Sequence, residues 1–292
     1  MRIVVTLPAY HEEQTIAAAI QEIHEALKGY PYSIHVLDDG SRDKTAAIAR
    51  SLGAMVTSHP RNFGLAEAFR EEMRQALQRK ADIIIHTDAD LQYPARHIPE
   101  MIAALKKGND LVLGSRFAGR IESMPLLKRL GNKAFSRVIS HIAGIRVTDA
   151  QTGFRAFTPA VARLPIISGY TYTQEQIIRA ARAKLRIAEV PISARKTRQS
   201  RLMRNPFSYA YRVWITIMRI YRDFEPLKFF GGIGLFLFLV SFLFAVYTLI
   251  FTIHFGISAL DKIIPTLLVT VFFLLSGLQI ILFGFLADKQ RS

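Results

Sequence analysis

The 292-residue sequence contains no cysteine, which excludes a disulfide framework and any zinc site built from thiolates. It also lacks G-x-G-x-x-G after its first strand-like segment and G-x-x-x-x-G-K, so neither the dinucleotide fingerprint nor the P-loop is present. Any bound phosphate is therefore expected to be held by a metal ion and by arginine side chains. The first five residues lead directly into a strand-like segment rather than a signal peptide, so we expect the first part of the chain to be cytoplasmic.

Acidic residues are scarce beside basic ones, and the formal net charge is +15. The residues after Pro226 contribute only +2, so about thirteen of the positive charges fall on residues 1–226. A surplus of this size is typical of proteins that bind nucleic acid, an anionic membrane surface or phosphorylated substrates.

Two long apolar runs without any charged residue, 229–255 and 263–286, lie near the C-terminus. Each is longer than the roughly 20 residues that cross the core of a bilayer. The connector, residues 254–262, is too short to form a domain. The sequence therefore predicts a transmembrane hairpin of two helices, with a buried pair of soluble helices as the alternative.

Basic residues crowd the approach to the first run, whereas the connector carries only Lys262. They are Arg195, Lys196, Arg198, Arg201, Arg204, Arg212, Arg219, Arg222 and Lys228. Lysine and arginine near membrane spans favour the cytoplasmic side, so we predict an integral cell-membrane protein with both termini in the cytoplasm. Membrane lipids are then the nearest anionic partner of this surface, and we expect no nucleic acid to bind.

Residues 1–115 alternate between short apolar segments and segments with helical spacing. The strand-like segments are 3–7, 33–37, 54–58, the run that precedes Asp88, and 110–114. This alternation predicts an α/β fold with a mainly parallel sheet covered by helices on both faces. Ligands bind such sheets at the carboxyl ends of the strands. Polar clusters follow four of the strands, at residues 8–12, 38–40, 88–90 and 114–116.

Asp88 and Asp90 follow a buried strand-like run and are separated by one residue. On an extended strand end, side chains two residues apart point to the same side. Two carboxylates on one side could hold Mg²⁺ or Mn²⁺ against the phosphates of a substrate. A polar turn after the strand is the alternative for this pair taken alone.

Two further segments have amphipathic patterns. In residues 127–143, one arc of the expected helix holds Arg129, Asn132, Lys133, Ser136, Arg137 and Ser140, and the other holds Leu130, Ala134, Phe135, Val138, Ile139 and Ile142. Lys128 and His141 break this pattern, and the helix could lie at a membrane interface or pack on the sheet. The second segment begins at Asn205-Pro206 and carries Arg212, Arg219 and Arg222 on one sector, with Tyr209, Tyr211, Trp214 and Tyr221, so a helix lying on the membrane is favoured.

Six motifs occur in a fixed order: Pro8-Ala9-Tyr10-His11-Glu12-Glu13, Asp38-Asp39-Gly40-Ser41, Asn62-Phe63-Gly64, Asp88-Ala89-Asp90-Leu91-Gln92, Gly114-Ser115-Arg116 and Thr152-Gly153-Phe154-Arg155. Over about residues 1–205 this set resembles the dolichol-phosphate mannose synthases and related polyprenyl-phosphate glycosyltransferases, which are inverting enzymes with the GT-A fold. His11 stands where that family commonly has Asn. The expected organisation is a Rossmann-like GT-A domain over residues 1–204, a membrane-interface helix over 205–226 and two transmembrane helices over 227–288.

The resemblance implies a site for a nucleotide-sugar donor. The implied donor contacts are Pro8, Tyr10, Glu12, Val36, Asp38, Asp39, Asp88, Ala89, Asp90, Gln92 and Arg116. Asp90 and Gln92 are the implied ligands of a Mg²⁺ or Mn²⁺ ion, and Asp88, Asp90 and Arg116 the implied catalytic residues. The acceptor would be a dolichyl or polyprenyl phosphate, and Arg129, Arg195, Arg198 and Arg201 are the candidates that would bind its phosphate.

The activity that the resemblance implies is transfer of a sugar, mannose from GDP-mannose before others, to the lipid phosphate at the cytoplasmic membrane face. Direct displacement would invert the anomeric carbon and give a β-linked product. A glucosyl or aminosugar transferase that uses a UDP-sugar is the main alternative. A processive polysaccharide synthase would carry more membrane helices and a Gln-x-x-Arg-Trp motif, which is missing here. A non-catalytic membrane adaptor with an inactive transferase domain is the alternative from another class.

Overall fold

The computed structural model describes residues 1–292 except 168, 170, 196–205, 257–259 and 290–292. The chain divides into two compact units, Met1–Ala210 and Tyr211–Ser292. The boundary falls inside the amphipathic helix expected from Asn205-Pro206, so the predicted limits of the three domains stay a prediction.

The first unit is built on a seven-stranded sheet with the order β3-β2-β1-β4-β6-β5-β7. Its strands are β1 (Ile3–Ala9), β2 (Tyr32–Asp38), β3 (Met55–Ser58), β4 (Ile83–His86), β5 (Leu111–Ile121), β6 (Arg155–Phe157) and β7 (Ile187–Ala194). All seven residues of β1 are buried, as expected for a central strand with a covered face on either side. The β1–β2, β1–β4, β2–β3 and β5–β7 pairs are parallel. The predicted α/β fold with a mainly parallel sheet is therefore confirmed.

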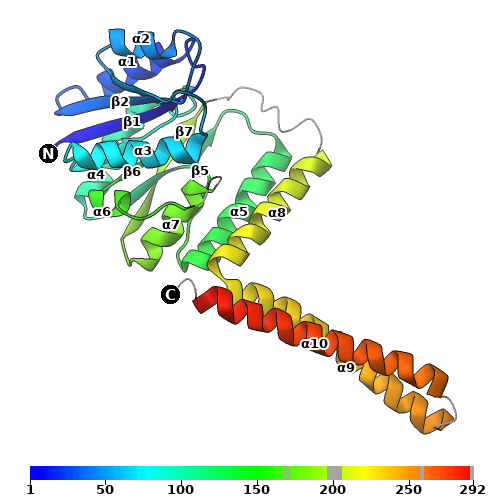
Figure 1. Cartoon of the computed structure of the whole chain (residues 1–292). Coiled ribbons are helices and arrows are strands. Elements are labelled where there is room, and N and C mark those ends of the chain that lie inside the picture. Colours follow the sequence, from blue (N-terminus) through cyan, green and yellow to red (C-terminus); the bar gives the residue numbers. More distant parts are fainter. Residues whose placement is uncertain (168, 170, 196–205, 257–259, 290–292) are drawn as a thin grey trace. The chain divides into compact units, whose positions relative to one another are not determined.

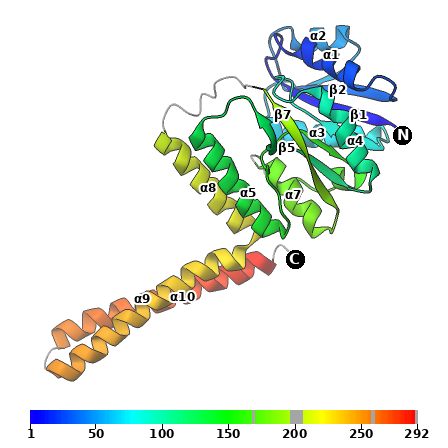
Figure 2. The same ribbon diagram turned by 180° about the vertical axis from the view of Figure 1, so that it is seen from behind.

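Helices cover both faces of this sheet (Figures 1 and 2). The unit contains α1 (Ile16–Ala26), α2 (Thr45–Ser51), α3 (Leu65–Gln78), α4 (Ile98–Lys106) with a short 3₁₀ turn η1 (Ala95–His97) before it, α5 (Leu126–Ala143), α6 (Pro159–Ala162) and α7 (Tyr172–Arg182). Residues of α1, α2 and α4 share one buried cluster with Ile3, Val5 and Leu7 of β1. On the opposite face, Phe69 of α3 contacts Phe157 and Tyr172.

One strand runs against the direction of its neighbours, which the sequence pattern did not indicate. The three residues of β6 pair antiparallel with both β4 and β5. A strand of three residues is too short to show an alternation of apolar and polar side chains. Its insertion brings the segment 147–154, which precedes β6, to the carboxyl end of β4.

The second unit contains two apolar helices, α9 (Pro226–Phe255) and α10 (Leu260–Lys289), which follow α8 (Pro206–Phe224). Both are long and apolar enough to cross a membrane, and most of their surface is exposed within the described residues. Large apolar side chains such as Leu235, Leu268 and Phe272 are about two-thirds exposed. Exposure of this kind is unlike the core helix of a soluble protein and matches the predicted transmembrane hairpin.

Two glycines allow α9 and α10 to approach closely. A Cβ atom on Gly234 would lie 2.7 Å from the carbonyl oxygen of Gly277, and one on Gly277 would lie 3.0 Å from the carbonyl oxygen of Gly234. The hydroxyl of Ser241 donates a 2.8 Å hydrogen bond to the carbonyl of Thr270 further along the pair. Small residues at a helix contact and a polar side chain bonded across it are typical of packing between transmembrane helices.

We expect Gly234→Ala to destabilise the hairpin by about 1–3 kcal/mol, because its methyl group overpacks the helix contact. Gly231→Ala is the matched control, since a Cβ there meets no atom of the described residues within 4 Å. Both substitutions add the same methyl group and the same helix propensity. Thermal or denaturant unfolding in detergent micelles measures the difference, and equal stability of the two variants would contradict the close contact.

Candidate active site

A cavity of about 530 Å³ opens at the carboxyl ends of β1 and β2. Its lining consists of Tyr10, His11, Gly40, Ser41, Arg42, His59, Pro60, Arg61 and Asn62. This volume lies within the range that holds small-molecule ligands. The ring of Tyr10 is 46% exposed and lies 4.2 Å from the ring of His11, so an aromatic surface is available beside the cavity.

The two acids that follow β2 shape the wall of this cavity. One carboxylate oxygen of Asp39 accepts hydrogen bonds from the backbone N–H of Phe63, at 2.9 Å, and lies 2.7 Å from Nδ1 of His59. Its other oxygen accepts the N–H of Gly64 at 2.8 Å. Asp38 accepts the backbone N–H of Ser41 at 3.0 Å. Asp39 therefore fixes the segment 59–64, whereas its predicted contact with the donor stays a prediction.

Gly40 is required in the same wall. Its φ of +79° lies in the left-handed region, and a Cβ there would lie 2.5 Å from the backbone carbon of Arg61. Only glycine allows the segment after β2 to approach the 61–62 backbone this closely. The glycine of the Asp-Asp-Gly-Ser motif thus has a steric explanation.

The other predicted donor contacts from β1 and β2 differ in accessibility. Pro8 and Val36 are buried strand residues, and Val36 belongs to the apolar core, so any donor contact from Val36 comes from its backbone. Glu12 accepts a 2.6 Å hydrogen bond from the hydroxyl of Thr15, and its backbone N–H donates to Thr45 at 2.9 Å. Glu12 thus joins the end of β1 to the starts of α1 and α2.

The segment Asp88–Gln92 is a turn rather than the end of an extended strand. β4 stops at His86, and Asp90 accepts the backbone N–H of Gln92 at 3.0 Å. Leu91 adopts a φ of +63°, in the left-handed region, which is incompatible with an extended strand. The expectation of an extended backbone through Asp88 and Asp90 is therefore wrong, because the strand ends at His86 and the Asp90 carboxylate bonds to the backbone of the turn that follows. The shared direction of the two carboxylates stays a prediction.

Asp88 lies against the segment that precedes β6. A Cβ on Gly153 would lie 2.9 Å from a carboxylate oxygen of Asp88, so the glycine of the Thr-Gly-Phe-Arg motif makes room for this carboxylate. Burial raises the pKa of Asp88 to about 6, and the negative charges of Asp90 and Glu72 add to this effect. Electrostatic interactions with His86 and Arg116 lower the pKa of Asp88 and so act in the opposite direction. Asp88 is thus a partly desolvated carboxylate inside a cluster of charges.

The donor set suits a hard divalent cation that also binds a substrate. Asp88, Asp90 and the Gln92 amide offer hard oxygens within one short turn, as Mg²⁺ and Mn²⁺ prefer. Among the described residues, no group of three or more His, Cys, Asp or Glu side chains could hold a metal ion. A small number of protein ligands fits ions that complete their coordination with phosphate oxygens and water.

Arg116 is held in a fixed orientation by Asp149, which the sequence analysis did not identify. The guanidinium donates through Nε and Nη2 to the two oxygens of Asp149, at 2.7 and 2.9 Å, and the backbone N–H of Arg116 donates to the same carboxylate at 3.1 Å. Asp149 is fully buried, and Arg116 is 4% exposed. The spacing between the two residues gave no signal, because Asp149 lies in the segment between α5 and β6.

Lys128, near the start of α5, is a second residue that sequence reasoning missed. Its pKa is lowered by burial and by the positive charge of Arg116, while the negative charge of Asp90 opposes both. Lys128 therefore lies within electrostatic range of the turn with the acids and of the guanidinium. The adjacent Arg129, predicted to bind the lipid phosphate, is exposed. The available signal was that Lys128 breaks the polar arc of this helix.

The two arcs expected for α5 are also rearranged. Asn132 and Ser136 of the polar arc are buried, and Leu130 of the apolar arc is 56% exposed. The inward polar residues hold the segment after the helix: Ser136 accepts the N–H of Ala150 at 3.0 Å. Burial on α5 therefore follows the hydrogen-bonding needs of the segment that carries Asp149 rather than hydrophobicity alone.

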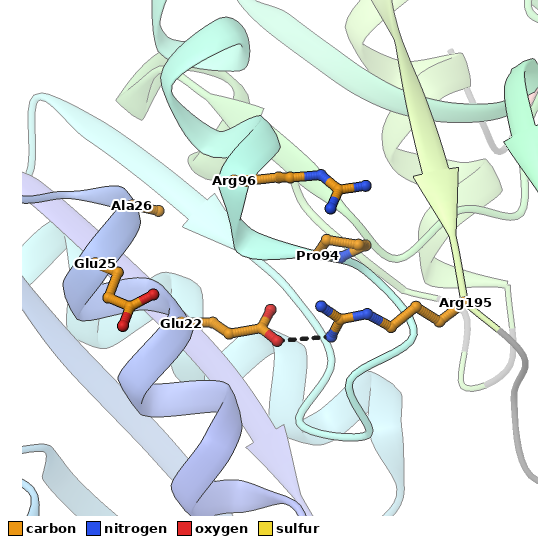
Figure 3. Close-up of a pocket in the computed structure, with 6 residues that line it drawn as sticks. All are labelled: Glu22, Glu25, Ala26, Pro94, Arg96 and Arg195. Carbon is orange, nitrogen blue, oxygen red and sulfur yellow. Dashed lines mark hydrogen bonds and ion pairs between the residues drawn. The ribbon is translucent and has the colours of Figure 1, made fainter.

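Of the remaining candidates for the lipid phosphate, Arg198 and Arg201 lie outside the described residues. Arg195 forms a 2.7 Å ion pair with Glu22 beside a cavity of about 350 Å³, and its backbone N–H donates to the carbonyl of Gln92 at 3.0 Å. Figure 3 shows the side chains of Glu22 and Arg195 reaching toward each other. The structure thus places the backbone of Arg195 against the turn with the acids and its side chain on α1.

The sequence of this chain is similar to those of known glycosyltransferases. The model of the family "Glycosyl transferase family 2" matches residues 4–168. The dolichyl-phosphate hexose transferase of Haloferax volcanii is 32% identical over 74% of this chain and 92% of its own length. The dolichol-phosphate mannosyltransferase of Pyrococcus furiosus is 29% identical over 66% of this chain and 56% of its own length. The UDP-N-acetylglucosamine–dolichyl-phosphate N-acetylglucosaminyltransferase of Methanococcus voltae is 30% identical over 66% of this chain and 86% of its own length.

A solved structure has the same fold. The glucosyl-3-phosphoglycerate synthase of Mycobacterium tuberculosis, in complex with Mn²⁺, UDP-glucose and phosphoglyceric acid, superposes with a TM-score of 0.61. The two sequences are 24% identical, and the match covers 75% of this chain and 79% of that one. The family match spans more than half of this chain and includes the segments after β1, β2 and β4, and the chain therefore belongs to glycosyltransferase family 2.

Proposed function

We propose that this protein transfers a sugar from a nucleotide-sugar donor to a polyprenyl phosphate, with mannose from GDP-mannose and dolichyl phosphate as the first candidates. One observation carries the proposal: Asp88 packs against Gly153 of the same segment in which Asp149 binds the buried Arg116, so the acidic turn and a buried cation share one edge of the sheet. The half-buried Lys128 interacts electrostatically with Asp90 and Arg116. Acids that can bind a metal–diphosphate and cations that can bind a second phosphate are both needed for this reaction. The names of three family relatives support the lipid phosphate as acceptor.

The donor is proposed to occupy the carboxyl edge of the sheet. The cavity beside Tyr10 would receive the nucleoside, and Asp38 and Glu12, next to its lining residues in sequence, stay proposed as contacts of the base and ribose. The diphosphate would extend toward Asp88, Ala89 and Asp90, and Arg116 would donate to its oxygens or to the sugar. Asp90 and Gln92 would hold a Mg²⁺ or Mn²⁺ ion, which supplies positive charge to offset the charge that develops on the leaving nucleoside diphosphate.

The acceptor needs little activation by a general base. A lipid monophosphate is largely anionic at neutral pH, because its second pKa is about 6. Its oxygen can displace the nucleoside diphosphate directly at the anomeric carbon, which gives inversion. Lys128 would place this phosphate opposite the acidic turn, and Arg129, Arg195, Arg198 and Arg201 stay proposed as further contacts. The same cations offset the repulsion between the acceptor phosphate and the donor diphosphate.

The hairpin of α9 and α10 is proposed to anchor the protein in the membrane where the lipid acceptor lies. The basic residues before α9 favour a cytoplasmic position for both termini and for the first unit. A catalytic unit on that side would meet the phosphate head of the lipid at the membrane surface. The hydrocarbon chain itself would not need to leave the bilayer.

A UDP-sugar donor is supported as well as GDP-mannose. The Methanococcus voltae relative is named for UDP-N-acetylglucosamine, and the superposed structure contains UDP-glucose. We expect purified protein, incubated with Mg²⁺ or Mn²⁺ and a polyprenyl phosphate, to use one of GDP-mannose, UDP-glucose and UDP-N-acetylglucosamine and to leave the others largely untouched. Radiolabel extracted into organic solvent measures this transfer, and binding of a donor without any transfer would favour the inactive adaptor.

Asp90→Ala is expected to lower the rate of transfer by about 10²-fold or more, the effect of removing a group that stabilises charge at the reacting centre. Asp82→Ala is the matched control, because Asp82 directly precedes β4 whereas Asp90 follows it, and the Asp82 carboxylate contacts the exposed backbone N–H of Arg2 at 2.6 Å and the N-terminal amine at 3.7 Å, away from the candidate site. Initial rates at saturating donor and acceptor are compared. Unchanged turnover in Asp90→Ala would refute the proposed metal and donor site.

The neighbours Lys128 and Arg129 separate two ways of binding the acceptor. We expect Lys128→Ala to raise the KM for the polyprenyl phosphate by about tenfold or more, since a hydrogen bond to a charged group contributes about 1.5–3 kcal/mol. Arg129→Ala should have the smaller effect, because Arg129 points to the exposed side of α5. Steady-state kinetics with the lipid varied at fixed donor measures both values. The reverse order of the two effects would assign the phosphate to Arg129.

A further inference from the structure

A chain of hydrogen bonds connects β7 to Arg116 without touching the donor cavity. It starts at Glu189, a half-buried residue of β7 that lies opposite Leu113 in the parallel pairing with β5. One carboxylate oxygen of Glu189 accepts the backbone N–H of Thr148 at 2.8 Å and that of Asp149 at 3.1 Å. The other accepts the hydroxyl of Thr148 at 2.8 Å. A single carboxylate thus binds the N–H groups of two consecutive peptides, those of Thr148 and Asp149.

The next links reach the guanidinium. The hydroxyl of Thr148 lies 2.6 Å from that of Ser115, and Ser115 accepts the backbone N–H of Ala118 at 3.1 Å. Asp149 binds the backbone N–H and two guanidinium nitrogens of Arg116. The residues on both sides of the Ser115–Arg116 bond are therefore tied to the same two-residue segment that Glu189 holds.

We propose that Glu189 is a positioning residue for Arg116, acting through Thr148 and Asp149. Arginine binds phosphate oxygens through a rigid planar guanidinium group, so the strength of this binding depends on the orientation of the guanidinium plane. Two of the guanidinium nitrogens are bonded to Asp149, which fixes the direction in which Nη1 is presented. A shift of the Asp149 backbone would rotate that plane even with the ion pair intact. This inference rests on the proposed function only for the identity of the phosphate that Arg116 meets.

Other features of this region do not replace Glu189. Ser136 of α5 accepts the N–H of Ala150 at 3.0 Å, which holds the segment one residue further along. Ser140 binds both the N–H and the carbonyl of Val147, each at 3.0 Å, which holds it on the other side. Between these anchors, the N–H groups of Thr148 and Asp149 depend on Glu189.

A double-substitution cycle tests the proposal. Glu189→Ala removes all three bonds, and we expect it to lower kcat for sugar transfer by about tenfold or more, because small misplacements of a binding group are costly. Glu189→Gln keeps one oxygen for both backbone N–H groups and should recover most of this loss. Arg116→Lys already removes the planar guanidinium group. Adding Glu189→Ala to this variant should therefore change kcat by less than about twofold, because the effects of coupled residues do not add. Equal losses in both backgrounds would overturn the proposal.

Asp110→Ala is the matched control. Asp110 accepts the backbone N–H of Arg186 at 2.9 Å at the amino ends of the same two strands, so its loss weakens the β5–β7 pair without touching the segment of Asp149. We expect it to leave kcat unchanged. Thermal unfolding of each variant shows whether it folds, and a loss of kcat in Asp110→Ala equal to that in Glu189→Ala would reduce Glu189 to a stabiliser of the strand pair.

A second readout does not require transfer to occur. In protein with ¹⁵N-labelled arginine, the Nε–H of Arg116, identified by its absence in Arg116→Lys, should exchange slowly with solvent because Asp149 accepts it. Glu189→Ala should speed this exchange by about tenfold or more, and Asp110→Ala should not, since loosening a closed hydrogen bond raises its open population. Unchanged exchange in Glu189→Ala would refute the positioning role. Absence of transfer with every donor would refute the proposed function and leave this result standing.

Discussion

The ion pair between Arg116 and Asp149 is the contact on which the geometry of the candidate site depends. Breaking a buried pair by removing one partner typically costs about 3–5 kcal/mol, because an uncompensated charge remains inside the protein. This pair joins the outer part of β5 to the segment before β6, and the same segment carries Gly153, against which Asp88 packs. The orientation of the guanidinium and the location of the Asp88 carboxylate are therefore set by one piece of backbone.

Burial raises the pKa of Asp88, and charges of both signs close to it modify that effect. Nδ1 of His86 lies 3.0 Å from the buried carboxylate of Glu72. Burial raises the pKa of Glu72, and the interaction with His86 opposes this shift. Arg155 is fully buried and bonded to backbone carbonyls such as that of Thr152; burial lowers its pKa to about 10, so it stays charged at neutral pH. A carboxyl with a raised pKa is less stable as an anion in the fold than in water. A cation that approaches Asp88 relieves this cost, which favours metal or basic ligands at the turn.

The sequence predicted those site residues that come directly after a strand, at the carboxyl edge of the sheet. The alternation of short apolar segments with helical spacing predicted β1 to β4, and the acids after β2 and β4 lie at the carboxyl edge as expected. Asp149 and Glu189 were missed because their roles arise from contacts of residues that are 33 and 73 positions from Arg116, which no local pattern encodes. The turn at Asp90 was missed for another reason: a carboxylate that caps its own backbone looks the same in sequence as one on a strand end. The only sequence signal for Lys128 was that it breaks the amphipathic pattern of residues 127–143.

α5 contributes residues to the candidate site on its inward side and exposes apolar and basic residues on its outward side. Its inward side offers Lys128 to the acidic turn and Ser136 to the Asp149 segment, which explains why polar residues are buried on a helix that packs against α7. Its outward side combines Leu126, 71% exposed, and Leu130 with the exposed cations Arg129, Lys133 and Arg137. Apolar side chains flanked by lysine and arginine are typical of helices that lie in a membrane interface. The two expectations for this helix, packing on the domain and lying at an interface, are thus compatible, because they concern opposite sides. Under the proposed function, the inner side of this helix would offer Lys128 to the lipid phosphate, and the exposed Arg129 beside it would contact anionic lipid at the interface.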